Sequence, residues 1–324
     1  MKNKNILITT HHDAFLHPRG GEIEMKIIHD LLNKYGANAK LYSPIQLTQK
    51  NFDVVIHFSV QNNGFELLKA LKNKNKKIIL YPNLWWNDSI NENEISNAKK
   101  FFDLSNLIIF KSLSEFKNIS NKINLEKYNT KIIFPFVKYD FEKKINHEKF
   151  KFTYDLDQFI LSIGVIEENK NQLDLIKSFK KLNRPNLKLV IIGEQIDKSY
   201  FKKCRIDSNE KVIFLPQMDH ASDMQIAAIK SCDLYVELSS EPAGLSVLEV
   251  AKFEKKILIK KSEWSDEFFG NEKNFLENLD ENIISKKMNS MIQESNSIEK
   301  NTFNELKKKV DEKNIYQLIE AVNN

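Results

Sequence analysis

The sequence predicts an α/β protein of two domains, each built around a parallel sheet that helices cover on both faces. Short, almost wholly apolar stretches alternate with segments of helical spacing, which is typical of strands buried on both faces of a sheet. This alternation stops in a charged, unpatterned stretch at 138–156 and then begins again. A chain of 324 residues is long enough for two domains of ordinary size. We therefore expect domains at 1–145 and 146–324.

The first domain is expected to begin with a buried strand at 5–9, a polar loop and a helix at 22–35, whose apolar residues lie on one stripe. Further strands are expected at 54–58, 78–81, 107–110 and 131–134, with a helix at 65–73. Such domains bind ligands at the carboxyl ends of their strands. Four candidates lie near these ends, namely Arg19, Gly20, Gly21 and His57. A plain turn is the alternative for the glycine pair, and a structural histidine is the alternative for His57.

The second domain repeats the alternation. Its expected strands are 159–163, 187–192, 211–215 and 232–238, and its expected helices are 171–182, 221–230 and 245–253, with polar helical sequence from 272 onwards and a last helix at 313–322. The strand at 232–238, the turn at 239–244 and the helix at 245–253 form the most informative segment.

This segment contains two glutamates, Glu241 and Glu249, separated by seven residues. Gly244 lies between them, and because glycine has no Cβ, a ligand could approach the backbone there. The first N–H groups of the following helix have no partner within that helix and suit an anion such as a diphosphate. Glu249 lies on an apolar helix, where a carboxylate needs hydrogen-bond donors, and sugar hydroxyls are suitable donors. The alternative is that Glu249 reaches solvent and Glu241 is an ordinary loop acid.

The run SSEPAGLSVLEVAKFEKKILI resembles the E-x7-E signature of family 4 glycosyltransferases. Upstream, ILSIGVIEENKNQLDLIKSFKKL and LKLVIIGE are similar to the opening of the same family's donor domain. The resemblance covers about residues 159 to 260, and in the first half it depends on Gly20-Gly21. It implies the GT-B arrangement, two Rossmann-like domains that face each other across a cleft, with a last helix that crosses back onto the first domain.

The resemblance also implies an activity and residue roles. The activity is transfer, with retention at the anomeric carbon, of a hexose or N-acetylhexosamine from a nucleoside diphosphate sugar to a glycan or lipid-linked acceptor, without a metal or other cofactor. Glu241 would contact the donor sugar, Gly244 and Leu245 would offer N–H groups, Glu249 would hold the ribose hydroxyls, and Gly164 and Gly193 would belong to the donor site. Arg19, Gly20, Gly21 and His57 would lie on the acceptor and phosphate side.

Lys170 and Glu241 are the expected catalytic residues, because the family clamps the leaving diphosphate with an arginine and a lysine. Lys170 stands at the lysine position, but Val165 stands at the arginine position. We therefore expect Lys170 to carry an unusually large share of the charge stabilisation. The competing interpretations are a nucleotide-sugar epimerase, or a degenerate relative that binds sugars or a partner subunit.

Charge and composition suggest location and partners. Residues 1–150 carry 23 Lys+Arg against 15 Asp+Glu, a net charge of +8, so an anionic membrane surface is a possible peripheral partner, with a lysine-rich solvated surface as the alternative. No nucleic-acid motif is present. We expect a cytoplasmic protein, because there is no signal sequence and only two cysteines. Peripheral binding to the inner face of the membrane would be compatible with this location. His11, His12 and His17 are not expected to bind metal, since adjacent histidines tend to point apart.

Overall fold

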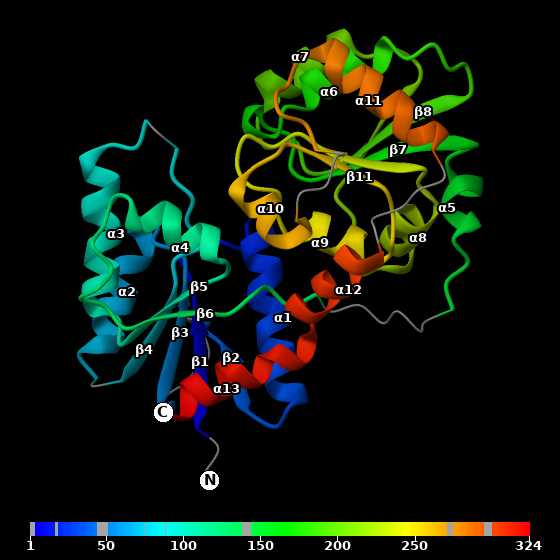
Figure 1. Ribbon diagram of the computed structural model, residues 1–324. Coiled ribbons are helices and arrows are strands. Elements are labelled where there is room, and N and C mark those ends of the chain that lie inside the picture. Colours follow the sequence, from blue (N-terminus) through cyan, green and yellow to red (C-terminus); the bar gives the residue numbers. More distant parts are fainter. Residues whose placement is uncertain are drawn as a thin grey trace. The chain divides into compact units, whose positions relative to one another are not determined.

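A computed structural model describes residues 4–16, 19–43, 51–74, 76–87, 89–137, 144–270, 275–294 and 300–324 of the chain (Figure 1). The chain divides into two compact units. The first unit comprises Met1–Lys138 together with Lys309–Asn324, and the second comprises Tyr139–Lys308.

The first unit is built on a parallel sheet in the order β2-β1-β3-β4-β5-β6. Its strands are β1 (Asn5–Thr9), β2 (Asn38–Leu41), β3 (Val54–Phe58), β4 (Lys77–Tyr81), β5 (Leu107–Phe110) and β6 (Thr130–Ile132). Its helices are α1 (Gly20–Lys34), α2 (Asn62–Lys72), α3 (Glu92–Leu104), α4 (Leu113–Ser120) and α13 (Ile315–Asn323), the last preceded by a 3-10 turn, Glu312–Asn314. All five neighbouring strand pairs are parallel, as expected.

Two helices of the first unit begin where a side chain binds the first backbone N–H groups. The Asn91 side chain accepts hydrogen bonds from Asn93 N and Glu94 N at the start of α3, and Ser112 does the same for Glu115 N at the start of α4. The core under the helices is apolar and almost fully buried, with Val55, Leu80 and Phe101 at its centre. The short strand β2 was not predicted, because Asn38 and Lys40 interrupt its apolar pattern.

The second unit is built on a parallel sheet in the order β11-β10-β7-β8-β9. Its strands are β7 (Gln158–Ile163), β8 (Leu187–Ile192), β9 (Val212–Leu215), β10 (Leu234–Glu237) and β11 (Ile257–Ile259). Its helices are α5 (Glu148–Thr153), α6 (Gln172–Lys180), α7 (Lys198–Asp207), α8 (Asp223–Ser231), α9 (Leu245–Lys252), α10 (Glu263–Phe269), α11 (Glu281–Gln293) and α12 (Lys300–Lys309), and a 3-10 turn, Glu168–Lys170, precedes α6. All four strand pairs are parallel.

The strand order of the second sheet fixes where a ligand can bind. From β7 the chain proceeds outward to β8 and β9, and then returns to place β10 on the other side of β7. The connections from β7 and β10 therefore leave in opposite directions. In open parallel sheets, ligands bind at the carboxyl ends of the strands on either side of such a reversal.

Candidate functional site

Residues from both strands beside this reversal lie at the carboxyl edge of the second sheet. Gly164 directly follows β7, and Lys170 ends the 3-10 turn that leads into α6. Glu237 ends β10, and the loop after it leads to α9. Gly193, another sequence-predicted donor residue, directly follows β8, so the predicted donor residues of this unit follow three neighbouring strands, β10, β7 and β8.

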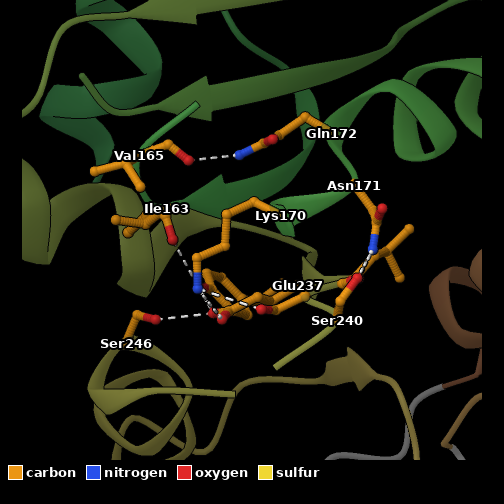
Figure 2. Close-up of polar contacts among 11 residues, drawn as sticks. Ile163, Val165, Lys170, Asn171, Gln172, Glu237, Ser240 and Ser246 are labelled. Carbon is orange, nitrogen blue, oxygen red and sulfur yellow. Dashed lines mark hydrogen bonds and ion pairs between the residues drawn. The ribbon is translucent and has the colours of Figure 1, made fainter. Parts of the chain in front are cut away.

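Two loops are joined tightly around Lys170. Asn171 has a left-handed backbone, with φ of 52°, and its Nδ2 donates to Leu238 O at 2.8 Å and to Ser240 Oγ at 3.0 Å. Ser240 N in turn donates to Asn169 O at 2.8 Å. The turn that carries Lys170 is thus fixed to the loop that follows β10 (Figure 2).

The Lys170 side chain points towards the end of β10 and remains 22% exposed. Its Nζ donates to Ser239 Oγ at 3.3 Å and lies 3.9 Å from Glu237 Oε1 (Figure 2). Neither contact is short for an ammonium group, for which charge-assisted hydrogen bonds measure about 2.7–2.9 Å. Lys170 can therefore offer its charge to another group without breaking a tight ion pair.

Glu237 is a member of this site that the sequence reasoning missed. It is only 7% exposed, and its Oε2 lies 3.0 Å from the Tyr235 hydroxyl and 2.9 Å from Ser246 Oγ. Burial, and then the Glu237 charge, raise the pKa of Tyr235 well above its usual value, so Tyr235 keeps its proton. A glutamate at the end of the apolar run Leu234-Tyr235-Val236 was the available signal.

The glycines of the site have different reasons for being glycine. A Cβ on Gly193 would lie 1.8 Å from Gly164 O, so close packing of the two loops demands glycine at this position. A Cβ on Gly164 or Gly244 would meet no atom within 4 Å. Gly164 also has a φ of 156°, which other residues rarely adopt. Internal packing therefore explains Gly193, whereas at Gly244 it gives no reason for glycine.

The helix α9 begins at Leu245, with Gly244 as a cap residue that has no side chain to bind the first N–H groups. The predicted strand, turn and helix are thus confirmed. Glu241 lies in the turn and is exposed. Glu249 is 3% exposed, and its Oε1 lies 2.6 Å from Nε2 of His220, in the loop after β9. The alternative, that Glu249 reaches solvent, is wrong, and the hydrogen-bond partner that its carboxylate needs comes partly from a histidine that the sequence did not indicate.

Val165, at the position where a second cation was expected, is a buried apolar residue. It is 9% exposed, and its carbonyl accepts a hydrogen bond from Gln172 Nε2 at 2.8 Å (Figure 2). Gln172 is itself 3% exposed. This hydrogen bond from a side chain to a backbone carbonyl fixes the start of α6 to the segment after β7.

In the first unit, Arg19 and Gly20 lie at the exposed start of α1. A Cβ on Gly21 would lie 2.5 Å from Asn83 Nδ2, so packing against Asn83 explains this glycine. Asn83 accepts a hydrogen bond from Lys111, which forms an ion pair with Glu24 of α1 at 2.9 Å. The glycine pair thus begins a helix that is fixed to the ends of β4 and β5.

His57 lies one residue before the end of β3 and is completely buried. Its Nδ1 lies 2.8 Å from Thr9 Oγ1, and its ring packs on Phe101 with centroids 5.8 Å apart. Burial, with a smaller effect from His11, lowers its pKa to about 3, so the ring is neutral. In this structure His57 has the environment of a structural histidine.

A family model, Glycosyl transferases group 1, matches residues 143–313, which is more than half of the 324 residues. The chain belongs to this family. The match includes the whole set from Gly164 to Glu249, and it makes the protein a retaining glycosyltransferase that uses a nucleotide sugar donor.

Solved structures support the fold of this group 1 glycosyltransferase. HepE from Anabaena, in complex with UDP and glucose, is 16% identical with a TM-score of 0.75, and the alignment covers 99% of each chain. Sucrose-phosphate synthase from Thermosynechococcus elongatus is 12% identical with a TM-score of 0.79, over 99% of this chain and 98% of that one. WaaG, a glycosyltransferase of lipopolysaccharide biosynthesis, is 13% identical with a TM-score of 0.69, over 98% of each chain. The predicted GT-B fold with two Rossmann-like sheets is therefore confirmed. No curated protein matches the chain in sequence.

Two further features of this glycosyltransferase concern the parts of the chain that the structure describes. Within them, no group of three or more His, Cys, Asp or Glu side chains could hold a metal ion, and His17, part of the histidine loop, lies outside them. No helix in the same residues combines the length and the apolar character needed to cross a bilayer.

Proposed function

We propose that the protein transfers a hexose or N-acetylhexosamine from a nucleoside diphosphate sugar to a glycan or a lipid-linked acceptor, in the synthesis of a surface polysaccharide or related glycan. The observation that carries the proposal is the position of Lys170. Its partly exposed ammonium lies at the strand reversal, in the same unit as the uncapped start of α9. Together they offer a positive charge and backbone N–H groups to a diphosphate.

Each donor residue has a proposed role that its environment supports. Lys170 and the first N–H groups of α9, at Gly244 and Leu245, bind the leaving diphosphate. Glu241, exposed in the turn, contacts the donor sugar. Glu249 holds the ribose hydroxyls, while His220 orients its carboxylate from the other side.

The chemistry explains why cations matter most here. As the bond between the anomeric carbon and the diphosphate oxygen breaks, its electron pair goes to the diphosphate. The acceptor oxygen bonds to the same carbon, and its proton passes to an oxygen of the departing diphosphate. Negative charge therefore grows on the diphosphate in the transition state. A fixed cation at this place stabilises the transition state more than the bound donor.

The first experiment is a thermal-shift screen of the purified protein against UDP-, GDP- and ADP-sugars. UDP-glucose is the first choice, since the similar HepE binds UDP and glucose. A ligand at 100 times its Kd stabilises the fold by about 2.7 kcal/mol. Products formed with oligosaccharide acceptors are then analysed by mass spectrometry and by NMR, because epimers of the donor have equal mass. A new glycoside supports transfer, an isomerised donor indicates an epimerase, and binding without any product indicates a degenerate sugar-binding relative.

For the acceptor side, we propose a cytoplasmic protein that touches an anionic membrane surface through the first unit. A hollow of about 730 Å³ at the amino edge of its sheet is lined by Lys72, Lys76, Lys77 and Lys131. Clustered lysines near a membrane add about 1 kcal/mol each to binding of acidic lipid. Co-sedimentation with liposomes should therefore need anionic lipid and weaken with salt. Binding that is independent of lipid charge contradicts the proposal.

A further inference from the structure

The carboxylate of Glu237 has two different sides. Its Oε2 accepts hydrogen bonds from two hydroxyls, those of Tyr235 and Ser246, and its Oε1 faces the Lys170 ammonium (Figure 2). Because the two hydroxyls come from β10 and α9, they hold the carboxylate in place whatever Lys170 does. Glu237 is therefore a fixed negative charge, and Lys170 is the movable partner.

Lys170 and Glu237 form a long ion pair. The distance from Nζ to Oε1 is 3.9 Å, compared with about 2.7–2.9 Å for a charge-assisted hydrogen bond. The ammonium also keeps a 3.3 Å contact with Ser239 Oγ and remains 22% exposed. The Lys170 ammonium can thus move towards an incoming phosphate while the Glu237 carboxylate keeps its position.

The charge balance at this strand reversal differs from what the family resemblance implies. An arginine and a lysine together would carry a charge of two. Here Val165 is neutral, and Glu237 lies within ion-pair distance of Lys170, so Lys170 and Glu237 sum to zero. A carboxylate a few ångströms from a bound diphosphate repels it, and water screens this repulsion only in part.

We propose that Glu237 is the counter-charge of Lys170 and weakens the hold of this site on the leaving nucleoside diphosphate, so that the product is released after transfer. The inference rests on the proposed function and adds a residue to it. Glu237 acts through Lys170 and through its own field, not by touching the reacting atoms.

The test compares Glu237→Gln with wild type by calorimetric titration of UDP, GDP, ADP and the matching nucleosides. Glutamine removes the charge and can still accept hydrogen bonds from Tyr235 and Ser246. We expect roughly tenfold tighter binding of the nucleoside diphosphate, the effect of two charges a few ångströms apart that water largely screens. Binding of the uncharged nucleoside should not change. A merely structural effect of the substitution would alter the binding of both ligands.

Glu210→Gln is the matched control, because Glu210 is exposed and precedes β9 at the opposite edge of the same sheet. It should leave diphosphate affinity unchanged. If Glu237→Gln does not fold, the triple variant Tyr235→Phe, Glu237→Leu and Ser246→Ala replaces it, since removing a buried acceptor together with its donors can leave stability nearly unchanged.

The outcomes separate the inference from the proposed function. If wild type binds no nucleoside diphosphate, the proposed function is wrong and the inference falls with it. If wild type binds one, and the neutral variant binds it equally well or more weakly, the inference alone is wrong and Glu237 instead positions Lys170 for binding. A gain confined to the diphosphate supports the inference.

Discussion

Each sheet of the molecule reverses its strand order once, between β1 and β3 in the first unit and between β7 and β10 in the second. In the first unit, Thr9 and His57 bond to each other across the reversal, and a Cβ on Gly64 would lie only 3.2 Å from the His57 ring. In the second unit, Lys170 remains partly exposed beside its reversal. The same topology thus carries a closed polar pair in one unit and an accessible cation in the other.

The difference shows that strand order predicts where a site can lie, but not whether the residues there bind a ligand or stabilise the fold. At the first reversal the buried Thr9 hydroxyl and His57 Nδ1 bond to each other, which stabilises the fold, while Nε2 of the same ring has no hydrogen-bond partner among the described residues. At the second reversal, Lys170 has long contacts, and Gly164 and Gly244 leave room above the backbone. Substitutions should therefore affect chemistry in the second unit and stability in the first.

The largest expected effect is that of Lys170→Ala. Loss of this cation should reduce turnover by about 100- to 1000-fold, as does loss of one donor that stabilises transition-state charge. The urea midpoint should change little, because the Lys170–Glu237 contact is loose. Steady-state kinetics of transfer measures the effect.

Lys177→Ala is the matched control for this prediction. The Nζ atom of Lys177 also lies 3.9 Å from a glutamate oxygen, Oε1 of Glu281. Lys177 lies within α6, however, and not at the strand ends. Its replacement should leave turnover unchanged. A loss of activity equal to that of Lys170→Ala would contradict the special role of the strand reversal.

The next effect concerns Glu249→Ala. The change should weaken donor binding by about 1.5–3 kcal/mol, the contribution of hydrogen bonds to a charged group, while the fold survives. Calorimetric titration with the nucleotide sugar measures it. Glu249→Gln should bind with intermediate affinity, since it keeps one acceptor oxygen. Unchanged donor affinity in both variants would show that Glu249 serves only to hold His220.

Local patterns predicted the sheets and most of the donor site. The apolar runs at β7, β8 and β10 were recognisable because parallel strands are buried on both faces. The pair Glu241 and Glu249 was chosen from its spacing in one segment, whereas Lys170, in the turn after Gly164, was chosen through the family resemblance. Partners distant in sequence were not, because no periodicity connects His220 with Glu249 or Tyr235 with its contact at Ile163.

Glu237 and His57 show the limit of such reasoning most clearly. Glu237 was passed over because its importance comes from contacts with Ser246 and Lys170, which only the folded chain brings together. His57 was a candidate because it lies near a strand end, but burial under neighbouring elements depends on side chains such as Phe101. The position of a residue along a strand predicts the end of the sheet at which it lies, but it does not predict whether its side chain is exposed.

In the first unit, Thr9→Val should reduce stability without affecting chemistry. Valine has the shape of threonine but no hydroxyl, so Nδ1 of the buried His57 loses its partner, at a cost of about 1–3 kcal/mol. Urea unfolding measures the loss, and turnover per folded molecule should be unchanged. Thr153→Val, at an exposed position on α5, is the control. A drop in turnover with unaltered stability would place His57 in the reaction instead.

The smallest effect is a pH dependence of stability. The folded pKa of His57 is about 3, below its ordinary value of 6.5, so between these values the unfolded chain binds a proton that the folded chain does not. Its contribution is complete above pH 6.5 and is lost as the pH falls towards 3, with a slope of at most about 1.4 kcal/mol per pH unit. Urea unfolding between pH 7 and 5 should show a shallower slope for His57→Leu than for wild type. Equal slopes would mean that His57 does not titrate in this way.

The helix α13 completes the first unit after the whole of the second has intervened. Ile315, Leu318 and Val322 are buried, the Lys4 ammonium donates to Val322 O at 2.9 Å, and the Lys77 ammonium donates to Ala321 O at 2.6 Å. During synthesis on the ribosome, the surface of the first sheet can therefore be fully covered only after the residues of α13 have been added. The second unit has no such dependence, because its residues are contiguous in the sequence. The order of synthesis and the order of completion are thus reversed, and the second unit can be finished first.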